Sequence, residues 1–261
     1  MASLRDISAE ALLLAGGGAA ILLQVADPRI AAGVAHHSDF ATRPLDRLHG
    51  TLTYLYVTEF GTPEEAAAIA RQVGSAHRPV PGAQDEQLQL WVAATLYWTA
   101  IEVHELVLGG RGLGGSGLGE SDATRDRVRD DEQLLREFAA VGTALGMPQS
   151  LWPSDTAAFA AYWAQRQGGL EVGEDARRVA RDLLHPSNIP WWMRRLMPTV
   201  RLMTTALLPL PLRDAYGLEL DERRWSRLLR FARAVYPRLP RAVRHAPLRR
   251  YLRAYRRRAA G

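Results

Sequence analysis

The chain of 261 residues contains neither cysteine nor lysine, so all 33 of its basic residues are arginine. Without cysteine it has no disulfide, no thiolate metal site, no iron–sulfur cluster, no thiolate-ligated haem and no cysteine nucleophile. Without lysine it has no amine for a Schiff base and no lysine for a phosphate-binding loop. These two absences exclude several large classes of enzyme.

No apolar run is long enough to cross a bilayer as a single helix. The most apolar stretch runs from Ala11 to Ala26 and includes Gln24 and three consecutive glycines, whereas a membrane-spanning helix needs about 20 apolar residues. We therefore expect a buried segment here and no transmembrane helix. No secretory or lipidation signal is evident, so the expected location is cytoplasmic.

The composition is that of a globular protein with a sizeable core. Hydrophobic residues make up 47% of the chain and charged residues 23%, which excludes a disordered or fibrous chain. Apolar residues are spread evenly, with no Ser/Pro/Gly linker between two halves. This distribution predicts one domain over residues 1–261.

Helical signals dominate the sequence. Leucines recur at three- and four-residue intervals after Pro44, and Thr62-Pro63 is a typical helix start. The helix that Thr62 opens is expected to run to about Gly74, and a longer, central and buried helix should follow Asp85 and end at a glycine pair. Further helices are predicted over 124–145, 154–166 and 173–184, and a surface loop over the Gly/Ser segment 109–119. Alternating strand patterns are essentially missing, so the predicted fold class is all-α.

Charge is distributed unevenly along the chain. Residues 221–261 hold 14 arginines against two acidic residues, whereas residues 1–220 hold 19 arginines against 26 acidic residues. Arginines at helical spacing could follow nucleic-acid phosphates or an anionic membrane surface. The interleaved leucine, phenylalanine and tyrosine residues favour another interpretation, in which the segment 220–261 packs on the acidic body. We therefore expect no nucleic-acid partner.

The helix after Pro44 carries the first group of candidate site residues. Arg47, Thr51 and Tyr54 share a face next to the leucine stripe. An arginine buried there needs a partner. This partner could be a substrate carboxylate, a haem propionate or a nearby glutamate, or the arginine could lie at the surface.

The helix after Asp85 carries the second group. Its residues fall on two lines at helical spacing, one with Ala93, Tyr97 and His104 and the other with Trp91, Thr95, Trp98 and Glu102. A glutamate on so apolar a helix is either a salt-bridge partner or an acid–base group with a shifted pKa.

An ordered series of motifs gives the chain a resemblance to a known family. The strings are LLLAGGGAAILLQVADPRIAAGVAHHSDF, RPLDRLHGTLTYLYVTEFG, AHRPVPG, LWVAATLYWTAIEVHE, LGMP and LLPLPLRDAYGL. In this order the series resembles the rubber-oxygenase catalytic-domain family, which includes MpaB-type oxygenases and latex-clearing protein. The resemblance implies a globin-like, all-α multi-helix bundle that encloses a central apolar pocket with a b-type haem.

The resemblance also implies roles for individual residues. Arg47 and Thr51 match an Arg-x-x-x-Thr pair that lines the family's pocket. The family string Leu-Trp-Val-His-Ala-Thr-Leu places an iron-binding imidazole on the central helix, where this chain has Ala93. A methyl group cannot ligate iron, so Tyr97 or His104 would have to do so if haem is bound. The family's His-Pro is likewise replaced here, by Asp27-Pro28.

Three classes of function follow from these patterns. The first is an oxygenase-like haem enzyme that acts on an apolar small molecule. The second is a haem-free cyclase or isomerase of natural-product biosynthesis that uses the former haem cavity as its substrate pocket. The third is a binding module without chemistry. The candidate catalytic residues are Arg47, Thr51 and Glu102, and the candidate pocket residues are Tyr54, Trp91, Ala93, Thr95, Tyr97 and Trp98.

Overall fold

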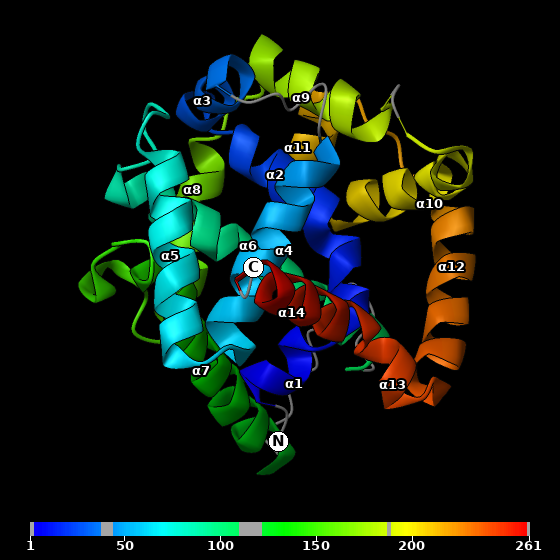
Figure 1. Cartoon of the computed structure of the whole chain (residues 1–261). Coiled ribbons are helices and arrows are strands. Elements are labelled where there is room, and N and C mark those ends of the chain that lie inside the picture. The colour runs from blue at the N-terminus through cyan, green and yellow to red at the C-terminus, as the bar shows by residue number, and fades with distance from the viewer. Residues whose placement is uncertain (1–2, 38–43, 110–121, 187–188, 260–261) are drawn as a thin grey trace.

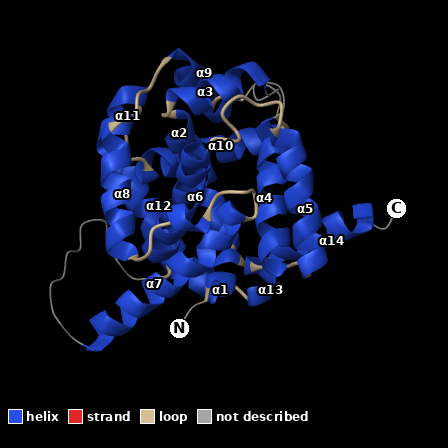
Figure 2. Ribbon diagram, turned by 90° about the vertical axis from the view of Figure 1, so that its left-hand side faces the viewer, coloured by secondary structure: helices blue, strands red, loops and turns tan. Residues whose placement is uncertain are grey.

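The computed structural model describes residues 3–37, 44–109, 122–186 and 189–259. Within these ranges, the side chains of residues 36–37, 44–48, 122–130 and 192 are not described. The described residues contain helices and connecting segments but no strand, which confirms the all-α prediction (Figure 2). Most of the predicted surface loop 109–119 lies outside the described residues.

Fourteen α-helices and three short 3-10 helices make up this part of the chain. The α-helices are α1 (Leu4–Ser8), α2 (Gly17–Val25), α3 (Pro28–His37), α4 (Pro44–Phe60), α5 (Pro63–His77), α6 (Glu86–Val107), α7 (Asp122–Thr143), α8 (Thr156–Gly168), α9 (Glu174–Leu184), α10 (Trp191–Leu207), α11 (Leu210–Tyr216), α12 (Glu222–Val235), α13 (Arg241–Arg244) and α14 (Ala246–Ala259). The 3-10 helices are η1 (Ala11–Gly16), η2 (Gln149–Leu151) and η3 (Tyr236–Arg238).

Capping residues fix the starts of helices α5 and α6. Thr62 caps α5: its side chain accepts a hydrogen bond from the Glu65 backbone, and the Glu65 carboxylate accepts one from the Thr62 backbone. Asp85 caps α6 by accepting hydrogen bonds from two backbone amides of the first turn. Both starts agree with the sequence, but α5 runs about one turn beyond the expected end at Gly74.

The core is built around α6 and the apolar segment η1–α2. Trp91 on α6 and Leu22 and Leu23 on α2 are fully buried. Gly18 lets α2 approach α10 closely, because a Cβ there would collide with the Thr204 side chain. Most of the segment Ala11–Ala26 is therefore buried or half-buried, as predicted, and Figure 1 shows the other helices arranged around α2 and α6.

The Arg-rich C-terminal segment lies against the N-terminal half of the chain. Helix α14 packs on α4 (Figure 1), and Arg256 forms a bidentate ion pair with Glu65 at 2.8 and 3.0 Å. Arg244 pairs with the buried Glu10 at 3.2 Å. Among the described residues, no single helix meets both the length and the hydropathy needed to cross a membrane. By length and composition alone, the segments 11–25 and 28–35 would do so only together, and they are bent by 107°.

Candidate functional site

A cavity of about 580 Å³ opens between helices α3, α4, α5, α6 and α7 and the connection 78–85. This volume lies within the range of small-molecule sites. Most of the side chains that line the cavity are apolar. Several are small, and the glycines among them are Gly33, Gly50, Gly74, Gly82 and Gly142.

Missing side chains on facing helices help to create this space. Gly50 on α4 and Gly74 on α5 both line the cavity, and a Cβ at either position would meet no atom within 4 Å. Gly82 has a φ of 78°, in the left-handed region that glycine favours. It allows the tight turn by which the connection after α5 passes over the cavity.

A few polar side chains from separate elements reach the cavity. Gln24 on α2 lines it, and its side-chain amide donates a hydrogen bond to the Thr95 hydroxyl at 3.0 Å. The Thr95 hydroxyl in turn donates to the Val92 carbonyl on the same helix at 2.7 Å. Gln89 is also in the lining and donates its amide to the Ala83 carbonyl at 2.9 Å. These bonds hold both glutamines at the edge of an otherwise apolar space.

The structure brings three of the predicted site residues to the cavity: Thr51 and Tyr54 on α4 and Ala93 on α6. Tyr54 is buried, and its hydroxyl donates to the Val141 carbonyl at 2.5 Å. Burial raises the pKa of Tyr54 far above its ordinary value, so the phenol stays protonated at neutral pH. The backbone of Arg47 lies in α4, one turn before Thr51, but its side chain lies outside the described residues.

Trp91 and Trp98 lie in the core beside the cavity rather than in its lining. The Trp91 indole donates to the Leu23 carbonyl at 3.1 Å, and the Trp91 and Trp98 rings contact the Trp163 ring with centroids 5.1 and 4.8 Å apart. Thr95 reaches the site only through its hydrogen bond from Gln24. These residues hold the wall of the cavity in place.

Tyr97 occupies an aromatic cluster on another side of α6. Its ring makes edge contacts with Phe138, Trp152 and Phe159 at centroid distances of 5.5, 6.1 and 4.9 Å. Burial raises the pKa of Tyr97 far above its ordinary value. The ring therefore serves the packing of α6 against α7 and α8.

Glu102 and His104 lie further along α6, about 13 and 16 Å beyond Ala93 at the rise of an α-helix. Both are half-buried, and the His104 imidazole lies 3.8 Å from the Glu105 carboxylate. Neither residue belongs to the described lining of the cavity. A catalytic role for Glu102 stays a prediction. Ligation of iron by His104 or Tyr97 likewise stays a prediction.

His77 is a lining residue that the sequence interpretation missed. It is the last residue of α5, it is half-buried, and it lines the cavity. It is also the only imidazole among the described lining residues. The string AHRPVPG places this histidine directly before a Pro/Gly turn, but it does not show where the turn leads.

The family resemblance implies a haem, and the lining offers few donors for its iron. Ala93 offers a methyl group and cannot ligate iron, and the Tyr54 hydroxyl is engaged with Val141. The imidazole of His77 is of the type that commonly ligates haem iron. Among the described lining residues, His77 is therefore the one whose side-chain chemistry would suit haem iron.

Comparison with known proteins identifies the family. Residues 4–235 match the family described as "ER-bound oxygenase mpaB/B'/Rubber oxygenase, catalytic domain", and the chain therefore belongs to this family. It is 31% identical over 198 residues to an uncharacterised protein of Mycobacterium bovis and equally to one of Mycobacterium tuberculosis. Each match covers 71% of this chain and 72% of the relative. No solved structure matches the chain.

Proposed function

We propose that this member of the mpaB/rubber-oxygenase family is an oxygenase-like enzyme that acts on an apolar small molecule in the cavity that helices α3 to α7 surround. The observation that carries the proposal is the position of His77, an imidazole beside an apolar space of about 580 Å³. Family membership supports the oxidative class of chemistry. An apolar lining with few polar groups is what an apolar substrate requires.

The chain's own residues supply binding and orientation. Small residues on α4 and α5 leave room for the substrate, and apolar side chains such as Val34, Val73 and Leu96 exclude water from it. Thr51 on α4 and Gln24 on α2 approach from separate helices and can fix a polar substituent of the ligand. Tyr54 keeps α4 against α7, because its hydroxyl ties the two helices together.

The cofactor of this proposal is haem b, and when bound it would supply activation of dioxygen. His77 would hold the iron. Arg47, one turn before Thr51 on α4, is the residue that we assign to a propionate or to a polar group of the substrate. Arginine suits this role because its guanidinium stays charged and matches the geometry of a carboxylate.

A second candidate function rests on Ala93. Its methyl group lines the cavity where the family resemblance implies an imidazole. If no cofactor occupies the cavity, the protein would be a cyclase or isomerase that folds an apolar ligand, with His77 as its acid–base group.

Absorption spectroscopy distinguishes the two candidates. The protein, expressed with a haem precursor and then titrated with hemin, is expected to develop a saturable Soret band. His77→Ala should remove or shift this band, whereas His104→Ala and Tyr97→Phe should leave it unchanged. Wild-type protein that stays colourless throughout would overturn the haem proposal and leave the cofactor-free candidate. A band that changes only in His104→Ala or Tyr97→Phe would show that His77 was the wrong ligand.

A further inference from the structure

Large apolar side chains are exposed on helices α10 and α12, away from the cavity. Trp191 at the start of α10 is 70% exposed, Leu196 on the same helix 53%, and Phe231 on α12 65%. Helices α10 and α12 contact each other, and Figure 1 shows them meeting along one edge of the molecule. We call the surface that carries Trp191 and Phe231, together with the arginines described next, the outer face of α10 and α12. Leu196 lies about 140° around α10 from Trp191 and flanks this face.

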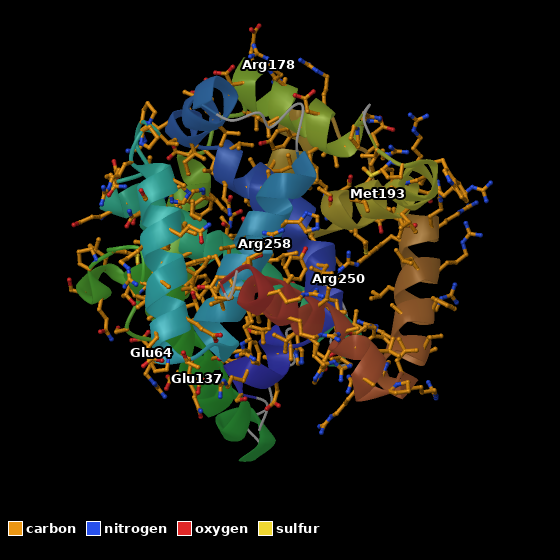
Figure 3. All side chains as sticks on the ribbon, viewed as in Figure 1. Glu64, Glu137, Arg178, Met193, Arg250 and Arg258 are labelled. Atoms are coloured by element: carbon orange, nitrogen blue, oxygen red, sulfur yellow. The ribbon has the colours of Figure 1, made fainter. Side chains whose placement is uncertain are left out.

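Arginines surround the exposed apolar side chains. Residues 191–243 contain 11 arginines and four acidic residues. On α12, Arg227, Arg230 and Phe231 lie one helical turn or less apart and are all exposed. On α10, the Arg195 guanidinium lies over the Trp191 ring, 5.5 Å from its centroid. Figure 3 shows nitrogen-tipped side chains projecting outward along the edge that α10 and α12 form.

Arg227 and Arg230 on α12 differ from Arg256 on α14 in their partners. Arg256 on α14 is paired with a carboxylate. Arg227 and Arg230 instead donate through Nε to backbone carbonyls one turn earlier on α12, at 3.3 Å. Among the described residues, neither forms an ion pair with a carboxylate. The charges of Arg227 and Arg230 are therefore directed to solvent.

Three kinds of partner could cover such a face. Nucleic-acid phosphates would pair with the arginines but would leave Trp191, Leu196 and Phe231 exposed to water. A second copy of the chain would bring arginine against arginine. An anionic bilayer matches both features, because aromatic and aliphatic side chains enter the headgroup region while arginines contact lipid phosphates.

We propose that the outer face of α10 and α12 docks on the surface of an anionic lipid bilayer. Trp191 and Phe231 enter the interface, and Arg195, Arg227 and Arg230 contact the lipid headgroups. The protein then lies on the membrane without crossing it. This inference is independent of the chemistry in the cavity.

Vesicle co-sedimentation of the full chain tests the proposal. We expect binding to vesicles of equal parts phosphatidylcholine and phosphatidylglycerol, weak binding to phosphatidylcholine alone, and release at high salt. The double variant Arg227→Glu/Arg230→Glu should weaken binding about tenfold or more, because each arginine near an anionic surface contributes about a factor of five. Arg257→Glu/Arg258→Glu on α14 makes the same change in net charge and should have a much smaller effect.

A second pair of measurements separates the three partners. The double variant Trp191→Ser/Phe231→Ser keeps every charge, and it should lose vesicle binding while any affinity for duplex DNA is unchanged. Circular dichroism checks that each variant remains folded. The proposal is overturned if the wild-type chain does not bind anionic vesicles, or if the serine variant binds them normally. It is also overturned if light scattering shows a dimer that only the serine variant abolishes.

Discussion

His77, the last residue of α5, and Ala93, near the middle of α6, line the same cavity. The cavity therefore has an imidazole on the helix where the sequence interpretation placed no functional group. It has a methyl group where the family resemblance implies the imidazole. Several consequences of this arrangement can be measured.

Filling the cavity from α5 should block the site without unfolding the protein. Gly74→Ala should raise the free energy of unfolding by about 0.5–1 kcal/mol, because alanine favours the helix and a Cβ there meets no atom within 4 Å. Gly74→Leu should keep the fold but lose hemin and ligand binding. Denaturant titration and absorption spectroscopy measure the two effects.

The matched control is Gly168→Leu, at the exposed end of α8, where an added Cβ also meets nothing. It should leave binding unchanged. Normal hemin binding by Gly74→Leu would show that the cavity is not the site.

Trp91 should prove to be a residue of the core. Its ring is fully buried, packs on Trp163 and lies under the Arg166 guanidinium, 5.1 Å from its centroid. Trp91→Ala should reduce the free energy of unfolding by about 3–5 kcal/mol. Trp91→Phe should cost less and should retain hemin binding. Selective loss of binding in a stably folded Trp91→Phe protein would instead place this residue in the site.

The Tyr54 hydroxyl should contribute to stability through one carbonyl group. Val141 lies in the last turn of α7, where helix carbonyls lack partners within the helix, and Tyr54 donates to it. Tyr54→Phe should therefore lower the free energy of unfolding by about 1–2 kcal/mol. Tyr251→Phe removes a hydroxyl that makes no hydrogen bond among the described residues, and thermal unfolding should reveal a smaller change. Equal effects of the two variants would contradict this role.

Asp27 should make the stability depend on pH under acidic conditions. Burial raises the pKa of Asp27, but hydrogen bonds from Arg29 and Arg166 outweigh burial and lower this pKa to about 2. An aspartate in an unfolded chain has a pKa of about 3.9. The carboxylate therefore stabilises the fold by about 2 kcal/mol above pH 4, and this contribution is lost as the pH falls from about 4 to 2.

Asp27→Asn should remove most of this contribution at pH 7. The free energy of unfolding of this variant should also fall less steeply between pH 4 and pH 2. Denaturant titrations across this pH range measure both changes. The control is Asp175→Asn on α9, where the carboxylate is 30% exposed. This variant should keep the pH dependence of the wild-type free energy of unfolding. If Asp27→Asn keeps the wild-type pH dependence between pH 4 and pH 2, Asp27 is not its source.

The sequence predicted the helices better than it predicted the site. Thr62 and Asp85 act locally, through backbone groups three residues away or less, so their helix starts could be predicted from neighbouring residues alone. The surroundings of α6 could not. This helix is apolar almost all round, and its sequence does not tell which line of residues faces a cavity and which faces α2 or α8.

Tyr97 illustrates this limit. It lies one helical turn beyond Ala93, yet its ring is held among Phe138, Trp152 and Phe159, which come from three later parts of the chain. His77 was missed because its position also depends on distant parts of the chain. Its place at the cavity depends on how residues 78–85 fold back, and no local pattern encodes that path. The single domain, the haem and the cytoplasmic location stay predictions.

Diffraction at the iron absorption edge, from crystals of the protein grown with hemin, tests the account most directly. We expect an anomalous peak in the cavity between α5 and α6, within bonding distance of the His77 imidazole. Iron bound instead to Tyr97 or His104, or a cavity that holds none, would contradict it.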